Sequence, residues 1–503
     1  MNNTLVRKKF KNMHNNHTPI SAKTSLTQCK KVLPILLLTF LSFAALAQNT
    51  DRIDFVVRHI TRKHDVKHAS LGVCVHNITK DSTIYTRNED LAMMPAAINK
   101  LFTTAASYSR LGPKFTFETN LLYSGSIDKQ GNLNGDIFVV GSGDPFFCSD
   151  RFPHTDSTFF RFTSALRKLG IKHVNGHIYV DTSLYDDEMV HPSWQWRDLG
   201  NYYGSGASGL NYNENSIDVH LRAGRRVGTP AVITGTHPDI PIANHAVTGT
   251  RDTNFDICFF GSPYESGRIC RGVIPMGASD THFRASLPQP GLTMAKDFTA
   301  YLRNHGISVS GEPSVNFEMP TQYRQICADT SFSLFMITAL TMQTNSTIAS
   351  ESLFKLMGYI RDGHGGYGSG RAFMYDYFKE LGLDGSEVNI VDGSGLSRDN
   401  HVTPYFVCQF LDAIARQPFF LDFVGTMGIS ANLPEAAIIP NLPEDCFLKI
   451  KCGVMQGVRN FVGYFTNEND EMFCFSILCN NYDCSDETMD SMIKGILDEI
   501  VRL

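Results

Sequence analysis

The chain has 503 residues, of which 42% are hydrophobic and 19% are charged, and its formal net charge is −5. This is an ordinary globular composition, with more apolar side chain than one small core needs, so we expect two or more domains. The acidic balance excludes a protein built mainly to bind polyanions.

The N-terminal segment has the pattern of an export signal. Its first 50 residues contain seven Lys and Arg and no acid before position 51, and they lead into the apolar run Val32–Ala47. That run is too short and too interrupted by proline to span a bilayer comfortably. It ends in Ala45-Leu46-Ala47, a small-x-small cleavage pattern, so we predict a signal peptide over residues 1–47 with cleavage before Gln48. An uncleaved anchor is the alternative.

The mature chain is therefore expected to be periplasmic or otherwise extracytoplasmic, and not membrane-spanning. Cleavage would remove seven cations and no acid, so the formal charge would fall from −5 to −12, which disfavours nucleic acid and anionic lipid as partners. Eleven cysteines remain, an odd number without CxxC spacing, so neither a zinc site nor a disulfide pattern can be inferred. His64 and His68 stand four residues apart without a visible third ligand. We predict no metal and no cofactor.

The N-terminal part of the mature chain alternates between helical and strand patterns. Residues 51–62 carry apolar side chains at helical spacing, and Leu71–Val75 alternates like a half-buried strand. Pro95 opens a run of helix formers from Ala96 to Leu111, which ends at Gly112-Pro113. These patterns predict a helix, a strand and a second, buried helix.

From residue 114 to 289 the chain shows short alternating runs punctuated by glycine, which indicates a mostly β insertion. Helical spacing returns at Leu292–Asn304 and at Phe332–Ile360. The remaining elements that we predict are strands at Phe447–Lys451, Phe461–Thr466 and Met472–Cys479 and an amphipathic helix at Glu487–Val501. We therefore expect one discontinuous α/β domain, residues 48–113 and 290–503, interrupted by a β-rich domain at 114–289.

Several short segments resemble one known family in their order and spacing. They are Met94-Pro-Ala-Ala-Ile-Asn-Lys100, Gly141-Ser-Gly-Asp-Pro145, His191-Pro-Ser-Trp194, Asp198-Leu-Gly-Asn-Tyr-Tyr203, Leu210-Asn-Tyr-Asn-Glu-Asn215, Asp392-Gly-Ser-Gly-Leu-Ser397, Val402-Thr-Pro404 and Lys451-Cys-Gly453. Together they resemble the low-molecular-mass class C penicillin-binding proteins, the serine D-alanyl-D-alanine carboxypeptidase/endopeptidase family. The resemblance implies a β-lactamase/transpeptidase-like fold of the α+β type, an antiparallel sheet flanked by helices, with an inserted β domain.

The resemblance also implies three site motifs: Ser-x-x-Lys at a helix start, Ser-x-Asn between helices and Lys-Thr-Gly on an edge strand. A serine needs a base to attack a carbonyl, and a lysine three residues later lies on the same helical face. Here the first motif is Ala97-Ile-Asn-Lys100, so the nucleophile position holds a methyl group. Thr103 and Thr104 lie about 9 Å or more further along the helix and are expected to pack, not to react.

The other two motifs also depart from the family. The second aligns best as Asn345-Ser-Thr347, although a shift of one or two residues would recruit Ser346 or Thr344. The third is Lys451-Cys452-Gly453, in which a weak thiol donor replaces a hydroxyl. The resemblance implies that Cys452 and Gly453 bind substrate, and we do not expect Cys452 to act as a replacement nucleophile.

Two further segments have less specific signals. Ser394 lies in a turn-like segment that the resemblance places near the site, and a simple surface loop is equally compatible with its composition. The two tryptophans, Trp194 and Trp196, could stack on sugars, but core packing is the more common role of such residues.

Three hypotheses follow for the function. The first is an exported homologue acting in peptidoglycan metabolism, catalytically degenerate because Ala97 replaces serine, which binds a stem peptide or a cell-wall protein. The second is an active carboxypeptidase or endopeptidase with an unrecognised nucleophile, or with water activated by Lys100 and Lys451. The third is a partner-binding role of the inserted domain alone. Changes in all three motifs favour natural divergence over a single engineered substitution.

Overall fold

The computed structural model describes residues 50–152, 157–428, 434–440, 442 and 446–503. The predicted signal peptide lies outside these residues. The chain forms two compact units, one from residues up to Pro95 together with Val402–Leu503 and the other from Ala96–His401. None of the helices in the described part of the chain combines the length and apolarity that a membrane crossing needs.

The first unit is built on a five-stranded antiparallel sheet. Its strand order is β2 (Ser82–Arg87), β1 (Ser70–Asn77), β22 (Met472–Asn480), β21 (Val458–Thr466) and β20 (Leu448–Met455). Every residue of β21 and β22 is buried. Strands that are apolar on both faces need a covering layer on each side.

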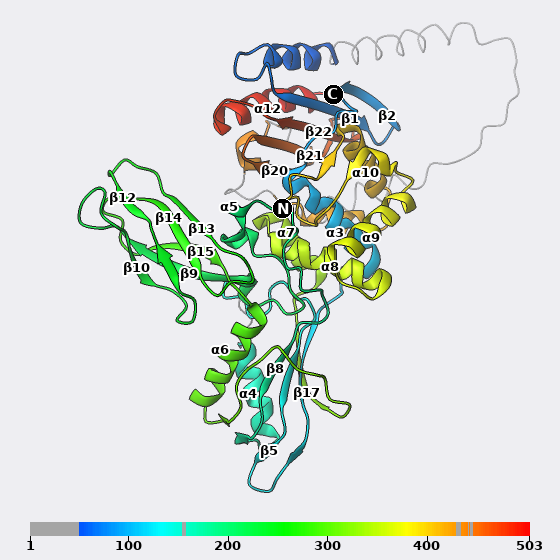
Figure 1. Ribbon diagram of the computed structural model, residues 1–503. Helices are drawn as coiled ribbons and strands as arrows, with labels where there is room; N and C mark the ends of the chain where they lie inside the picture. The colour runs from blue at the N-terminus through cyan, green and yellow to red at the C-terminus, as the bar shows by residue number, and fades with distance from the viewer. Residues whose placement is uncertain (1–49, 153–156, 429–433, 441, 443–445) are drawn as a thin grey trace, which may run out of the picture. The chain divides into compact units, whose positions relative to one another are not determined.

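Helices supply those two layers (Figure 1). A helix over residues 50–61 and α12 (Asp486–Ile500) share one core with side chains from one face of the sheet, including Phe465 and Phe475. On the opposite face, α10 (Pro404–Ala415) accepts a hydrogen bond at Leu411 O from the Tyr464 hydroxyl (2.8 Å). The other helices of this unit are α11 (Phe420–Thr426) and the 3-10 helix η5 (Pro434–Ile438).

The second unit contains a helical part in which α3 is surrounded by α7, α8 and α9. The elements of this part are η1 (Ala96–Ile98), α3 (Asn99–Leu111), α7 (Leu334–Thr344), α8 (Thr347–Asp362), α9 (Tyr367–Glu380), η4 (Gly385–Glu387), β18 (Val388–Asn389) and the first residue of β19 (His401–Val402). Ten residues of α3 are buried, from Asn99 to Tyr108. The predicted buried helix is thus confirmed, but its first turn is a 3-10 helix.

A second part of this unit packs two small sheets against α4 (Thr158–Lys168) and α6 (Pro290–Asn304) around a common core. One sheet has the order β17 (Arg324–Thr330), β3 (Glu118–Tyr123), β6 (Ile137–Val140) and β8 (Ile178–Asp181). The other has the order β16 (Ser308–Val309), β7 (His173–Val174), β5 (Asn132–Asn134) and β4 (Ser126–Ile127).

The third part, residues 216–286, is called the β lobe below. It consists of one sheet in the order β10 (Val232–Gly235), β9 (Ser216–Arg222) and β15 (Thr281–Ser286), and a second of β11 (Ile242–Asn244), β14 (Arg268–Pro275), β12 (Val247–Gly249) and β13 (Asp256–Phe260). The two sheets enclose an apolar core of their own. The short helices α5 (Trp196–Leu199), η2 (Tyr202–Gly204) and η3 (Asn213–Asn215) precede the lobe.

The predicted fold class is confirmed: helices flank an antiparallel sheet, and strands dominate the region after residue 114. Two features were not predicted. Helix α4 lies within the β-rich region, and β17, beyond residue 289, pairs with β3. The domain boundaries at 113 and 289 stay predictions.

Candidate functional site

The first motif lies where η1 meets α3. Ala97 is the middle residue of η1, and Lys100 is the second residue of α3. Lys100 is 2% exposed, and its Nζ donates a hydrogen bond to the carbonyl oxygen of Ser394 (3.0 Å). The structure therefore brings two predicted site residues, Lys100 and Ser394, into direct contact.

The two threonines that follow are bound to backbone carbonyls, as expected for packing residues. Thr103 Oγ1 donates to Gly393 O (2.8 Å), and Thr104 Oγ1 donates to Lys100 O (2.6 Å). Both side chains are fully buried. Neither hydroxyl is available to replace a serine at position 97.

The segment Asp392–Ser397 is held in place by the buried carboxylate of Asp392. Its Oδ1 accepts hydrogen bonds from Gly395 N (2.7 Å) and Asn400 Nδ2 (2.9 Å). Its Oδ2 accepts from Ser397 N (2.7 Å) and from Trp194 Nε1 (2.8 Å). Four donors to one carboxylate satisfy it without an ion pair and fix the loop that presents Ser394 O to Lys100.

Trp194 is thus a structural residue, 5% exposed and bonded through its indole N–H, as core packing predicted. Trp196, in contrast, is 53% exposed in α5. The Ser394 hydroxyl oxygen accepts from Leu396 N (3.3 Å), so its side chain helps to close the turn. The substrate-binding role of Ser394 stays a prediction.

Glu351 of α8 is a second buried acid at this loop, and sequence reasoning did not identify it. Its carboxylate accepts from Gly393 N (3.0 Å) and Ser394 N (2.7 Å). Burial, with the nearby Asp392 as a second cause, raises the pKa of Glu351 to about 8, against the opposing effects of the hydrogen bonds from Ser394 and Gly393 and of Lys100. Glu351 and Lys100 thus bind the backbone N–H and the backbone C=O of Ser394, respectively.

The raised pKa of Glu351 predicts a pH-dependent stability. The folded protein keeps this proton from about pH 4.5 to about pH 8, whereas the unfolded chain has lost it, so the free energy of unfolding falls as pH rises through that window. Glu351→Gln removes this term. We expect thermal denaturation to show the variant gaining stability relative to the native protein between pH 5 and pH 8. The exposed Glu468→Gln serves as control, and a pH-independent difference for Glu351→Gln would contradict the assignment.

The second motif forms the junction between α7 and α8. Asn345 ends α7 in a left-handed conformation (φ 53°), which asparagine tolerates better than most residues, and Thr347 begins α8. The alternative hydroxyls have local roles: Ser346 Oγ caps α8 by accepting from Ala349 N (3.3 Å), and Thr344 Oγ1 donates to Leu340 O (2.8 Å). The catalytic assignment of Asn345 and Thr347 stays a prediction.

Lys355, one helical turn after Glu351, is also buried. Its Nζ donates to Asp186 Oδ1 (2.8 Å) and to Glu188 O (2.6 Å), and it lies 4.7 Å from the centre of the Tyr367 ring. Burial lowers the pKa of Lys355, and Asp186 opposes that effect. This ion pair anchors α8, which carries both Thr347 and Glu351.

The third motif lies in the other unit, on β20, which is the edge strand of its sheet. Cys452 is fully buried and shares a core cluster with Ile450, two residues earlier on the same face of the strand. Lys451 and Gly453 therefore point to the opposite face. A thiol within an apolar core is a poor candidate nucleophile. The roles of Lys451, Cys452 and Gly453 at a site stay predictions.

Two further features of the first unit have some of the properties of a site. His76, Asp81 and Asp412 have potential ligand atoms within 4.8 Å of one another. The Arg416 guanidinium, however, donates to both carboxylates at 3.0 Å and already supplies a positive charge, so we assign no metal to this group.

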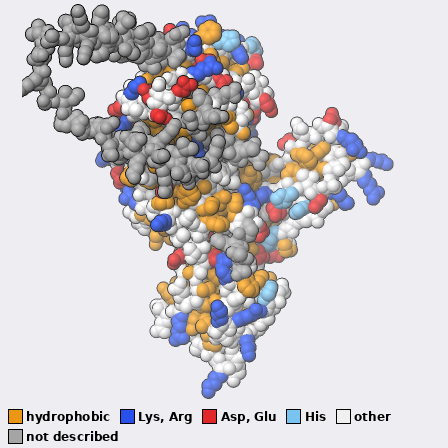
Figure 2. All heavy atoms as spheres, turned by 180° about the vertical axis from the view of Figure 1, so that it is seen from behind, with side chains coloured by type: hydrophobic (Ala, Val, Ile, Leu, Met, Phe, Trp, Pro, Cys, Tyr) orange, Lys and Arg blue, Asp and Glu red, His pale blue; other side chains and the backbone are white. Residues whose placement is uncertain are grey.

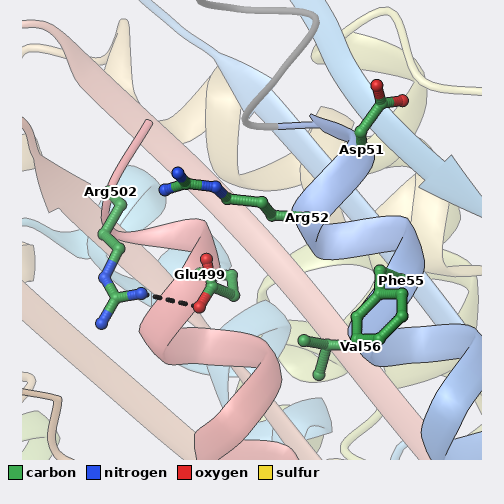
Figure 3. A pocket seen from close by; sticks show the side chains of 6 residues that line it. All are labelled: Asp51, Arg52, Phe55, Val56, Glu499 and Arg502. Atoms are coloured by element: carbon green, nitrogen blue, oxygen red, sulfur yellow. Dashed lines mark hydrogen bonds and ion pairs between the residues drawn. The ribbon is translucent and has the colours of Figure 1, made fainter.

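The second feature is a pocket of about 520 Å³ between the helix over residues 50–61 and the end of α12 (Figure 3). Six residues line it: Asp51, Arg52, Phe55, Val56, Glu499 and Arg502. Glu499 accepts from Arg502 Nη1 (2.7 Å), and none of the predicted site residues is present. We assign no chemistry to this pocket.

Comparison with known proteins decides the family. The model of the D-Ala-D-Ala carboxypeptidase 3 (S13) family matches residues 55–500. The chain belongs to the S13 family. The resemblance drawn from the short motifs is thereby confirmed.

Curated relatives and a solved structure agree with this assignment. The chain is 25% identical to the D-alanyl-D-alanine carboxypeptidase DacB of Haemophilus influenzae over 430 residues, covering 83% of this chain and 87% of that protein. It is 23% identical to the D-alanyl-D-alanine carboxypeptidase of Actinomadura, covering 82% and 78%. The crystal structure of penicillin binding protein 4 from Haemophilus influenzae superimposes with a TM-score of 0.77 at 22% identity, covering 90% of this chain and 99% of that one, which shows the same fold.

Proposed function

We propose that this S13 family member acts outside the cytoplasm in peptidoglycan metabolism, where it binds peptides ending in D-alanyl-D-alanine and does not cleave them. The observation that carries the proposal is the pair of residues at the start of α3. Ala97 offers a methyl group where the family has its serine, and Lys100 remains, with its Nζ bonded to Ser394 O. A methyl group cannot form an acyl-enzyme, so the covalent route of serine peptidases is closed.

The surroundings of Lys100 support retention of a binding site. The loop that receives its hydrogen bond is fixed from three sides, by Glu351, by Asp392 and by Asn99, whose Nδ2 donates to Asp392 O (2.7 Å). Such a network of buried polar groups requires every partner to stay in place. The network is complete beside Ala97, so the shape of this loop does not depend on a serine at position 97.

The first prediction of this proposal concerns the native protein. Mature protein incubated with a pentapeptide ending in D-alanyl-D-alanine is expected to release no D-alanine above a heat-denatured control. A fluorescent penicillin is expected to leave no covalent label on it. Release of D-alanine, or a stable label, would contradict the proposal and support an active peptidase with another nucleophile.

Binding is tested separately by calorimetric titration with the same peptide. The expected result is saturable binding of the D-alanyl-D-alanine peptide and none of its L-alanyl-L-alanine counterpart. Ala97→Phe should abolish this binding by filling the space beside Lys100, whereas Ala97→Ser should preserve it. If the folded native protein does not bind the peptide, the proposal is wrong. A partner-binding role of the inserted domain alone would then be the remaining hypothesis.

A further inference from the structure

One end of the β lobe brings together four arginines from two segments of the chain, residues 222–226 and the turn after β12. Arg222 ends β9, and Arg225 and Arg226 lie in the loop that leads to β10. This loop packs on β12 through Gly228 N→Thr248 O (2.8 Å). It also contacts the turn after β14 through Ala223 N→Ala278 O (2.9 Å).

The fourth arginine, Arg251, follows β12 and lies beside the same turn, because a Cβ atom on Gly277 would be 3.5 Å from its Nη1. Figure 2 shows blue side chains gathered at one end of this lobe. We call Arg222, Arg225, Arg226 and Arg251 the arginine tip.

The arginines of the tip are exposed and unpaired. None of the four side chains makes an ion pair or hydrogen bond with another residue in the part of the chain that the structure describes. Of the three other arginines of the β lobe, Arg271 on β14 is also exposed, whereas the remaining two have structural partners. Arg268 is 2% exposed and donates to Ser286 O (2.9 Å), and Arg284 pairs with Glu214 (3.5 Å).

The acids beside the tip offset only part of its charge. Asp280 pairs with His220 (3.1 Å), and Asp252 is exposed and anionic, since a hydrogen bond from Thr250 lowers its pKa. Four arginines beside these two acids leave the tip with a net positive charge in a chain whose net charge is negative. A concentrated charge of this kind attracts anionic partners locally and orients the molecule as a whole.

Exposed apolar side chains accompany these arginines. Val227, directly after Arg226, is 52% exposed, and Phe255, four residues after Arg251, is also 52% exposed. Gly228, directly after Val227, is in a left-handed conformation (φ 82°), which a bulkier residue would strain. Each of these two exposed apolar side chains thus lies within four residues of a tip arginine in the chain.

We propose that the arginine tip docks the protein on an anionic phospholipid surface. A bilayer interface takes both components, since cations meet lipid phosphates while exposed apolar side chains enter the headgroup region. A soluble polyanion would use the arginines alone and leave Val227 and Phe255 in water. This docking is independent of whether the chain cleaves or only binds peptide.

Co-sedimentation with lipid vesicles tests the proposal, using mature protein and vesicles with and without phosphatidylglycerol. We expect binding to the anionic vesicles only, weakened as salt is raised. Arg225→Ser/Arg226→Ser should lower the apparent affinity at least tenfold. Lys129→Ser/Lys172→Ser changes the net charge equally, uses two exposed lysines outside the lobe, and should leave the affinity within about twofold of native.

A second variant separates the lipid surface from other anions. Val227→Ser should weaken vesicle binding and leave binding to heparin, used as a soluble polyanion, unchanged. The proposal is overturned if the native protein ignores anionic vesicles, if it binds heparin but not vesicles, or if both double variants lose affinity equally. Thermal denaturation of each variant verifies that these surface changes leave the fold intact.

Discussion

Restoring serine at position 97 is expected to make the protein react with penicillin, slowly. The new hydroxyl would stand three residues before Lys100, on the same side of the start of α3. An amine that has given up its proton keeps two N–H donors and one lone pair, so in that form Lys100 could hold Ser394 O and accept the serine proton. The measurement is the rate of covalent labelling by a fluorescent penicillin.

The size of the effect depends on the second motif. Removal of one transition-state hydrogen-bond donor costs about 10²–10³ in rate. We therefore expect Ala97→Ser to label roughly 10²-fold more slowly than the same variant with Asn345→Ser and Thr347→Asn added. Ala97→Ser/Lys100→Met, the matched control without a base, should show at least about 10²-fold slower labelling than Ala97→Ser. Equal labelling with and without Lys100 would mean that Lys100 is not the base.

The secondary structure could be predicted where the pattern is local. The tail strands β20 to β22 and helix α12 follow from apolar runs and helical spacing, and their bounds agree with the predictions to within a few residues, except for a longer β20 and an earlier start of β21. Pairing between distant segments could not be predicted. The β3–β17 pair joins residues about 200 positions apart in the chain, and nothing in either strand alone specifies its partner.

In the candidate site, too, local motifs could be predicted from the sequence, whereas contacts between distant residues could not. Position 97 could be identified from the sequence because the resemblance depends on short motifs in a fixed order. Glu351 and Asp392 could not, since an acid in a helix or a turn normally faces solvent, and only the folded chain shows that both are fully buried. The burial of every residue of α8 from Thr347 to Gly358, which marks Glu351 as a bonded carboxylate, is itself a property of the fold.

The largest loss of stability is expected from Asp392→Ala. This change leaves four donors without their acceptor: Gly395 N, Asn400 Nδ2, Ser397 N and Trp194 Nε1. Each buried donor left unsatisfied costs about 1–3 kcal/mol. Entry of water into the space left by the carboxylate offsets part of this cost, so we expect a loss of about 3–5 kcal/mol in the free energy of unfolding. Urea denaturation measures it.

Asp399→Ala provides the control, since Asp399 is an exposed acid in the same segment and should change stability by less than about 0.5 kcal/mol. The loop is also the acceptor for Lys100, so Asp392→Ala should lower peptide affinity under conditions where the variant is still folded. Asp392→Asn discriminates between charge and hydrogen bonding. The amide oxygen of asparagine can still accept hydrogen bonds from two of the four donors. The amide N–H₂, however, would lie against the other two donors, which it cannot accept from, so this variant should lose nearly as much stability as Asp392→Ala. A near-native Asp392→Asn would show that the four donors do not depend on Asp392, and would remove the physical basis for treating the Ser394 loop as a fixed wall of the site.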